Sequence, residues 1–436
     1  IGKEALKNNT TANYNTALGA CVLFTATTAQ QNTAIGRNAM YNTTTGSYNT
    51  ALGAAALYQN TTGSENNATG WVALYGNTTG SQNTASGHYA LACNTTGDNN
   101  SAFGYHALCA NQTSGYNTAF GACALKANTG GYSTAVGGQA LYSNTTGRNV
   151  GVGLNALRLN TTGSCNTAMG DHAMYSNTTG CQNTASGWYS LFANTTGSSN
   201  SAFGWCSLRN NSTGASNSAF GRFAMRSNST ANYNSAFGES AMYSNTTGSC
   251  NTASGYKALY SNTTGIENAA LGNEALFSNT TGSYNSAFGH EAMLCNTSGS
   301  RNTSFGRTSL HKNTTGCCNT AMGMYAQLTN TTGSNNVALG KGASQCATTG
   351  SYNTVSGFYA LCTNTTGSYN AAFGANAMRN NTGNYNTAFG RQALLKGSGN
   401  NNVAIGNNAM VCLTTGHCNT AVGNGAGYYT TSGIYN

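Results

Sequence analysis

Cysteine is the residue type with the most evident capacity for chemistry in this chain. The 436 residues include 15 Cys, 6 His and 8 acidic residues. No two cysteines have the C-x-x-C spacing of zinc or thiol–disulfide motifs. Three pairs are instead separated by 16 residues, namely Cys93 and Cys109, Cys165 and Cys181, and Cys346 and Cys362.

This spacing is one residue short of a 17-residue repeat that runs through the chain. Two cysteines so spaced would lie on neighbouring coils of a stacked structure, offset by one residue, with their Cα atoms about 6 Å apart. That distance lies within the range of disulfides. We therefore predict three disulfides between coils and a fourth, across a turn, between Cys412 and Cys418; buried thiols are the alternative. Disulfides would indicate an oxidising compartment.

The recurring tripeptide N-T-T is a second potential site of chemistry, because it matches the N-glycosylation motif. Asn-Thr-Thr-Gly is also good turn chemistry, in which the glycine tolerates a positive φ. Both interpretations remain open from the sequence. The predicted glycosylation sites are Asn60, Asn77, Asn94, Asn144, Asn160, Asn177, Asn194, Asn245, Asn262, Asn279, Asn313, Asn330 and Asn364.

The other reactive residues form no catalytic pattern. The histidines are spread along the chain without a regular carboxylate partner, and the G-V-G at 151–153 lacks the strand–turn–helix context of a phosphate loop. We expect no enzyme activity, cofactor or metal. The 17 Lys and Arg residues form no continuous basic stripe, and no apolar run is long enough to span a bilayer. Nucleic-acid binding and membrane insertion are therefore not expected.

The repeat that would position these residues reads G-x-x-A-L-x-x-N-T-T-G-x-x-N-T-A-x. Its first residue, here called the main glycine, recurs 26 times between Gly2 and Gly423. Twenty-one intervals are 17 residues and four are 16; the short ones end at Gly137, Gly153, Gly390 and Gly406. Each short interval loses its residue between the N-T-T-G asparagine and the next A-x-G. One half of the repeat is therefore fixed, and the turn tolerates a deletion.

The repeat predicts an all-β parallel β-solenoid, a β-roll or β-helix, with about 26 rungs of 17 residues. A 17-residue unit is too short for a helix pair, and its Gly, Asn and Thr content disfavours helix. Proline, which cannot donate to a hydrogen-bond ladder, is absent. We expect two or three short strands per rung and a single continuous repeat domain, 1–436. Because the chain begins and ends within a repeat, we expect a fragment of a longer chain that lacks both caps.

Three columns of the repeat predict the core. Alanine stands three residues after the main glycine, Leu or Met follows it, and a second alanine stands two residues before the next main glycine. The residue just before the main glycine varies between apolar and small polar types, which indicates a partly buried or interface position. Asparagine occupies the fourth position before the glycine in 25 of 26 rungs, counting Asn436, with Ser133 as the exception. Stacked asparagines predict an amide ladder.

The segments "NTALGAAAL" and "NTASGHYAL" resemble the head repeats of trimeric autotransporter adhesins. The repeat also resembles the repetitive shafts of viral and phage tail-fibre proteins. The adhesin heads form a left-handed parallel β-roll from shorter rungs that lack the N-T-T-G turn. The resemblance implies a surface-exposed, trimeric fibre that is adhesive or serves as a spacer.

These observations predict a structural, non-enzymatic segment of an extracellular fibre or filament, homo-oligomeric and adhesive, at a cell surface or virion surface. Its expected partners are copies of itself, as a trimer or filament, and host-surface glycans. Outward tyrosines such as Tyr48 and Tyr58 suit a neighbouring chain or a sugar ring. One alternative is a glycan-binding adhesin rod. Another is an ice-binding solenoid, which would need two outward threonines at i and i+2, whereas Thr61 and Thr62 are adjacent.

Overall fold

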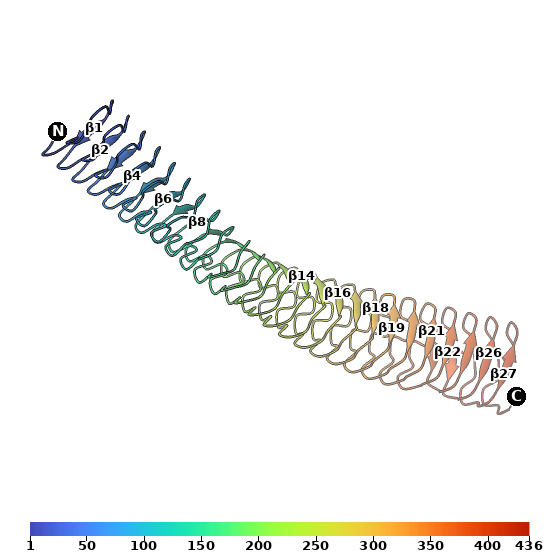
Figure 1. Ribbon diagram of the computed structural model, residues 1–436. Helices are drawn as coiled ribbons and strands as arrows, with labels where there is room; N and C mark the ends of the chain where they lie inside the picture. Colours follow the sequence, from blue (N-terminus) through green and yellow to red (C-terminus); the bar gives the residue numbers. More distant parts are fainter. Residues whose placement is uncertain (436) are drawn as a thin grey trace. The chain divides into compact units, whose positions relative to one another are not determined.

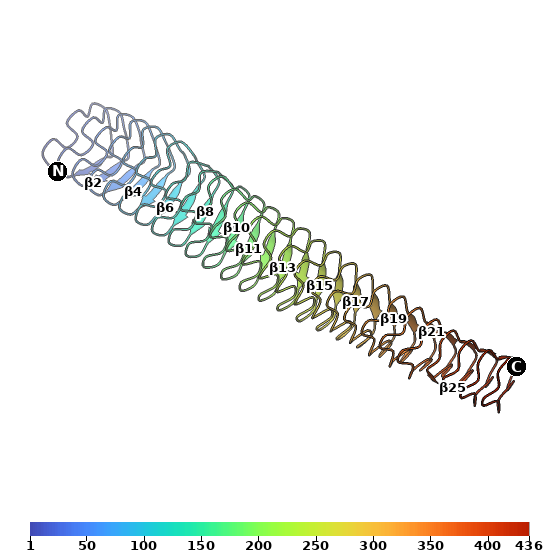
Figure 2. The same ribbon diagram turned by 90° about the horizontal axis from the view of Figure 1, so that it is seen from below.

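The computed structural model describes residues 1–435, and over these residues the chain is an all-β parallel β-solenoid without helix. The chain divides into two compact units, Ile1–Ser216 and Asn217–Asn436. In each unit the strands follow one another in chain order, as both views show (Figures 1 and 2). The predicted single domain stays a prediction, and Asn436 lies outside the described residues.

Every rung contributes one strand of three residues. Those of the first unit are β1 (Thr16–Leu18), β2 (Thr33–Ile35), β3 (Thr50–Leu52), β4 (Asn67–Thr69), β5 (Thr84–Ser86), β6 (Ser101–Phe103), β7 (Thr118–Phe120), β8 (Thr134–Val136), β9 (Val150–Val152), β10 (Thr167–Met169), β11 (Thr184–Ser186) and β12 (Ser201–Phe203).

The second unit continues the pattern and adds two strands of two residues, β23 and β25. Its strands are β13 (Ser218–Phe220), β14 (Ser235–Phe237), β15 (Thr252–Ser254), β16 (Ala269–Leu271), β17 (Ser286–Phe288), β18 (Thr303–Phe305), β19 (Thr320–Met322), β20 (Val337–Leu339), β21 (Thr354–Ser356), β22 (Ala371–Phe373), β23 (Asn380–Asn381), β24 (Thr387–Phe389), β25 (Lys396–Gly397), β26 (Val403–Ile405) and β27 (Thr420–Val422).

The strand register confirms that the turn, and not the strand, absorbs the missing residues. Within each unit, equivalent residues of successive rungs pair in parallel, as Thr16 does with Thr33. At a short rung the pairing stays in phase, so Thr118 pairs with Thr134 although only 16 residues separate them. The strand face is therefore continuous across the deletions.

The expectation of two or three strands per rung is confirmed only for the two rungs that contain β23 and β25, and it is wrong for the others. Most rungs have three non-glycine positions with φ near +50° to +60°, as at Ala55 (56°), Leu57 (51°) and Glu65 (60°). A left-handed residue interrupts an extended strand. The backbone still bonds from rung to rung outside the strand, since the Leu57 N–H donates to the Ala73 carbonyl at 3.0 Å.

Two glycine columns allow the rungs to stack closely. Gly187, a main glycine, has φ +141°, and a Cβ there would lie 2.4 Å from the carbonyl oxygen of Gly204. Gly63, in the N-T-T-G turn, was expected to supply a positive φ, but its φ lies outside that region. It is required because a Cβ would lie 2.3 Å from the Gly80 carbonyl oxygen.

The three predicted core columns are confirmed, since Ala51, Ala56 and Leu57 are all 0% exposed. The predicted asparagine ladder is confirmed as well. The Asn66 backbone N–H donates to Asn49 Oδ1 at 2.9 Å, and Asn66 Nδ2 donates to the Gly80 carbonyl at 2.9 Å. Asn66 thus bonds to the rung on either side of it, which satisfies polar groups inside a narrow core.

Candidate binding surfaces

The outer face of the strands carries an exposed line of apolar side chains. The middle residue of each strand points into the core, so its two neighbours point outward. In β6, Ala102 is 0% exposed while Phe103 is 36% exposed. We call the residues directly before the main glycines the apolar column. Its large exposed members are Leu18, Ile35, Leu52, Phe103, Phe120, Val136, Val152 and Met169 in the first unit, and Phe237, Leu271, Phe305, Met322, Leu339, Phe389, Ile405 and Val422 in the second.

The first residue of each strand forms the other outward column, and it is mostly threonine or serine. A typical rung therefore presents one hydroxyl and one apolar side chain, such as Thr118 and Phe120. The ice-binding alternative needs two outward threonines on every rung. Among the strands described in residues 1–435, this pairing is not the repeating pattern.

The outward tyrosines stack on one another along the rungs. Tyr41 and Tyr58 have ring centroids 5.2 Å apart, and Tyr58 and Tyr75 are 5.1 Å apart. In the second unit, Tyr352 and Tyr369 stack at 4.9 Å with an interplanar angle of 3°. The faces of these rings cover each other, so a partner meets mainly ring edges and hydroxyls. A ring face remains open only where a ladder ends.

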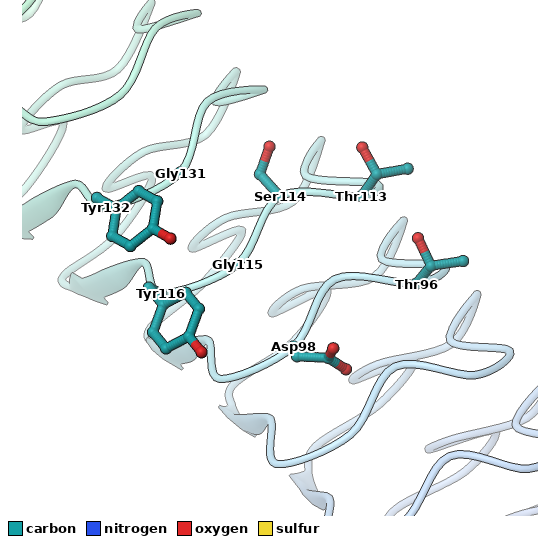
Figure 3. Close-up of a pocket in the computed structure, with 8 residues that line it drawn as sticks. All are labelled: Thr96, Asp98, Thr113, Ser114, Gly115, Tyr116, Gly131 and Tyr132. Carbon is teal, nitrogen blue, oxygen red and sulfur yellow. The ribbon is translucent and has the colours of Figure 1, made fainter.

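A hollow of about 330 Å³ opens on the first unit where a side-chain column stops (Figure 3). Before it, the Ser64 N–H donates to Ser81 Oγ at 3.1 Å and the Ser81 N–H donates to Asp98 Oδ1 at 2.7 Å. The next two rungs have Gly115 and Gly131 at this position and therefore no side chain. The lining residues are Thr96, Asp98, Thr113, Ser114, Gly115, Tyr116, Gly131 and Tyr132. Hydroxyls and one carboxylate make this hollow polar.

All fifteen cysteines carry thiols, so the predicted disulfides are not formed in the structure. The Cys109 and Cys362 thiols do interact with Cys93 and Cys346 respectively, as the 16-residue spacing implied.

The cysteines of the other two predicted pairs are free thiols as well. Cys181 Sγ accepts a hydrogen bond from the Ser164 N–H at 3.4 Å. The backbone N–H groups of Cys412 and Cys418 donate to rungs on opposite sides, at Tyr428 and Asn400. Spacing along the chain predicted neighbouring rungs but not the side-chain directions that a disulfide needs.

The partly buried Cys109 thiol should react slowly with alkylating agents. Burial, aided by the adjacent Cys93, raises the pKa of the Cys109 thiol to about 11 from its ordinary 9.0. The thiolate is the reactive form, so at about pH 8 we expect Cys109 to react about 100-fold more slowly than an ordinary thiol, with a rate that rises with pH. Time-resolved iodoacetamide labelling with peptide mass spectrometry measures this. Exposed Cys165 is the internal reference, and equal rates at the two sites would contradict the prediction.

The asparagines of the N-T-T-G turns form a second buried ladder. Asn177 is 0% exposed, and its Nδ2 donates to Asn160 Oδ1 at 2.7 Å and to the Gly180 carbonyl at 3.0 Å. A glycan on Nδ2 would need that nitrogen open to solvent.

The thirteen asparagines predicted as glycosylation sites are all at most 1% exposed, so the folded rungs leave no room for a glycan on them. They are Asn60, Asn77, Asn94, Asn144, Asn160, Asn177, Asn194, Asn245, Asn262, Asn279, Asn313, Asn330 and Asn364. The structure supports the other interpretation of the motif, turn chemistry, and shows in addition a ladder that was not predicted.

Three contacts between histidine and a carboxylate were not predicted from the sequence. Two of them join chain neighbours, and in one of these His290 Nδ1 lies 3.8 Å from Glu291 Oε1. His172 Nδ1 contacts the carboxylate of its neighbour Asp171. Glu291 Oε2 lies 3.4 Å from His311 Nε2, which comes from the following rung. The spacing between Glu291 and His311, one rung plus three residues, is the only signal of this contact in the sequence. Among residues 1–435, no group of three or more His, Cys, Asp or Glu could hold a metal ion.

No protein-family model matches the chain, and no curated protein matches it significantly. In the part of the chain that the structure describes, there is no helix with the length and apolar character to cross a membrane.

Proposed function

We propose that this chain is a structural, non-enzymatic segment of an extracellular fibre or filament, in which copies associate through the apolar column. The observation that carries the proposal is the exposure of large apolar side chains on the strand face, including Phe120 (58%) and Phe305 (55%). A line of exposed apolar residues along a sheet face is typical of a protein–protein contact.

A second copy of the chain is the partner that fits this column best. Neighbouring rungs are about 4.8 Å apart, so the apolar side chains recur at that interval. A partner can contact these side chains over many rungs only if its own surface repeats at the same interval. Another copy of the chain does so, because it has the same rungs. Small residues such as Ser86 and Ser186 interrupt the column between larger ones. Rings of one copy can therefore fit over the serines of another.

The interior of each unit suits a structural role, because it holds neighbouring rungs together. Main-chain bonds link each rung to the next inside and outside the strands, and two ladders of buried asparagines run beside the alanine and leucine columns. A stack held by bonds on every rung resists local opening, because a rung loses contacts with both of its neighbours when it opens. The resemblance to adhesin heads and tail-fibre shafts supports a location at a cell or virion surface.

Replacing two adjacent members of the column tests the proposal. We expect the chain to associate at micromolar concentration, and Phe103→Ser with Phe120→Ser to weaken association by at least about 10-fold, since two exposed rings are lost from each copy. Serine already occupies this column at Ser86, so the fold should tolerate the change. Sedimentation velocity over a concentration series gives the measurement.

The matched control removes two aromatic rings from a different outward column, by Tyr41→Ser with Tyr58→Ser. We expect this double variant to associate as the wild type does. A wild-type chain that remains monomeric throughout the concentration series would contradict the proposal. So would equal losses in the two double variants, because the apolar column would then have no special part in association.

A further inference from the structure

The column directly after the main glycines contains an aromatic ladder that ends beside an empty rung. On five consecutive rungs of the first unit this column reads Arg37, Ala54, Trp71, His88 and Tyr105. The ring centroids of Trp71 and His88 are 4.6 Å apart, and those of His88 and Tyr105 are 5.4 Å apart. Each aromatic residue therefore fills its own rung, while Ala54 leaves its rung without a ring.

The empty rung is a hollow of about 230 Å³. It is lined by Arg37, Asn38, Ala54, Ala55 and Trp71. Two rung spacings, about 10 Å, separate the positions of Arg37 and Trp71 along the axis. Since neighbouring rings in this ladder stack about one rung apart, the hollow has the thickness of one further ring. Trp71 is 50% exposed, and it is the residue at which the ladder ends.

The charge around the hollow favours an anion. Arg37 is exposed, and among residues 1–435 it has no ion pair. Its guanidinium offers up to five N–H donors in a plane that matches a carboxylate. On the nearby first rung, Glu4 is already paired with Lys7 at 3.1 Å. Asn38 adds an amide that can donate to a hydroxyl or carbonyl oxygen.

We propose that this hollow binds a six-membered ring that carries a carboxylate. The ring stacks on the Trp71 indole in the place of the missing side chain, and the carboxylate pairs with the Arg37 guanidinium. Such a ring stacks with one face on the indole, and its carboxylate accepts charge-assisted hydrogen bonds from the guanidinium on the other side. The ring can come from an acidic sugar or from an aromatic acid. This binding site goes beyond the structural role and is independent of association between copies.

Titration of the full chain with three small probes tests the proposal. The probes are glucuronate, its neutral counterpart glucose, and benzoate, and calorimetry or NMR line shifts report binding. We expect at least one of the two acids to bind at least about 10-fold more tightly than glucose, because only the acids carry a carboxylate that can pair with the Arg37 guanidinium. Preference for glucuronate identifies an acidic sugar, and preference for benzoate identifies an aromatic acid. The proposal is overturned if neither acid binds more tightly than glucose.

Filling the empty rung provides the decisive variant. Ala54→Tyr places in the hollow the residue type that Tyr105 supplies two rungs beyond Trp71, and we expect it to weaken binding at least about 10-fold with an unchanged melting temperature. Ala122→Tyr fills an alanine of the same column away from Trp71 and should bind as the wild type does. Arg37→Gln should remove the preference for the acid over glucose. Wild-type affinity in Ala54→Tyr would overturn the proposal.

Discussion

Gly137→Ala is expected to destabilise the first unit by about 4 kcal/mol, whereas Gly138→Ala should change its stability by less than about 1 kcal/mol. Gly137 is a main glycine with φ +129°, a backbone conformation that L residues rarely adopt. A Cβ there would also lie 2.5 Å from the Gly153 carbonyl oxygen. The clash can be relieved only by moving the two rungs apart, and the strain in φ would remain after that movement.

The adjacent glycine makes this a matched comparison. A Cβ at Gly138 would meet only Leu154 Cδ1, at 3.2 Å, and that side chain can move. Hydrogen exchange of the amides around β8 and β9 reports the local loss of stability, and thermal unfolding reports the global loss. Similar losses in the two variants would show that the rungs do not approach each other as closely as the main glycine column requires.

Asn177→Asp is expected to destabilise the same unit by about 3 to 5 kcal/mol at neutral pH. The change replaces the Nδ2 donor with an oxygen, which would then face Asn160 Oδ1 and the Gly180 carbonyl. Three oxygens would meet in a site that is 0% exposed, and one of them would carry charge. Asn177 Oδ1, which accepts from Asn194 Nδ2 at 2.8 Å, keeps an acceptor after the substitution.

The sign of the pH dependence distinguishes this cause from simple loss of packing. Burial among acceptors raises the pKa of the introduced carboxyl in the folded state above its unfolded value of about 3.9. Below the unfolded pKa the carboxyl is protonated and again supplies a donor, so the variant should approach wild-type stability. Stability relative to wild type should then fall as pH rises through the folded pKa.

Urea unfolding over a pH series measures this dependence. Gln182→Glu makes the same amide-to-carboxylate change at an exposed position on the same rung, and it should cost less than about 1 kcal/mol at every pH. A pH-independent loss in Asn177→Asp would argue against a buried amide donor at this position.

The fold followed from the sequence where spacing alone was informative. The interval between main glycines set the rung, and the place of the four deletions identified the turn as the part that can shorten. The left-handed conformations could not be predicted in this way. Leucine has no preference for positive φ, so Leu57 at φ 51° reflects the bonds of its rung to the next rung rather than its own propensity.

The functional surfaces were less accessible from the sequence. Variation between Phe103 and Ser86 in one column indicated an interface position, and the structure exposes the apolar members of that column. The buried ladder at Asn177 was missed because N-T-T is also a glycosylation motif. The hollow beside Trp71 exists because Ala54 has no ring to fill its rung. An alanine in the sequence indicates such a gap only when the residues above and below it in the stack are known.

A cryo-electron microscopy map of assembled full-length chains tests the central claim most directly, because it locates the contact between copies. The account predicts that copies meet along the strand face, with Phe103, Phe120 and the equivalent residues of the apolar column buried between them. A map in which this column faces solvent, while the copies meet through another face, would contradict it.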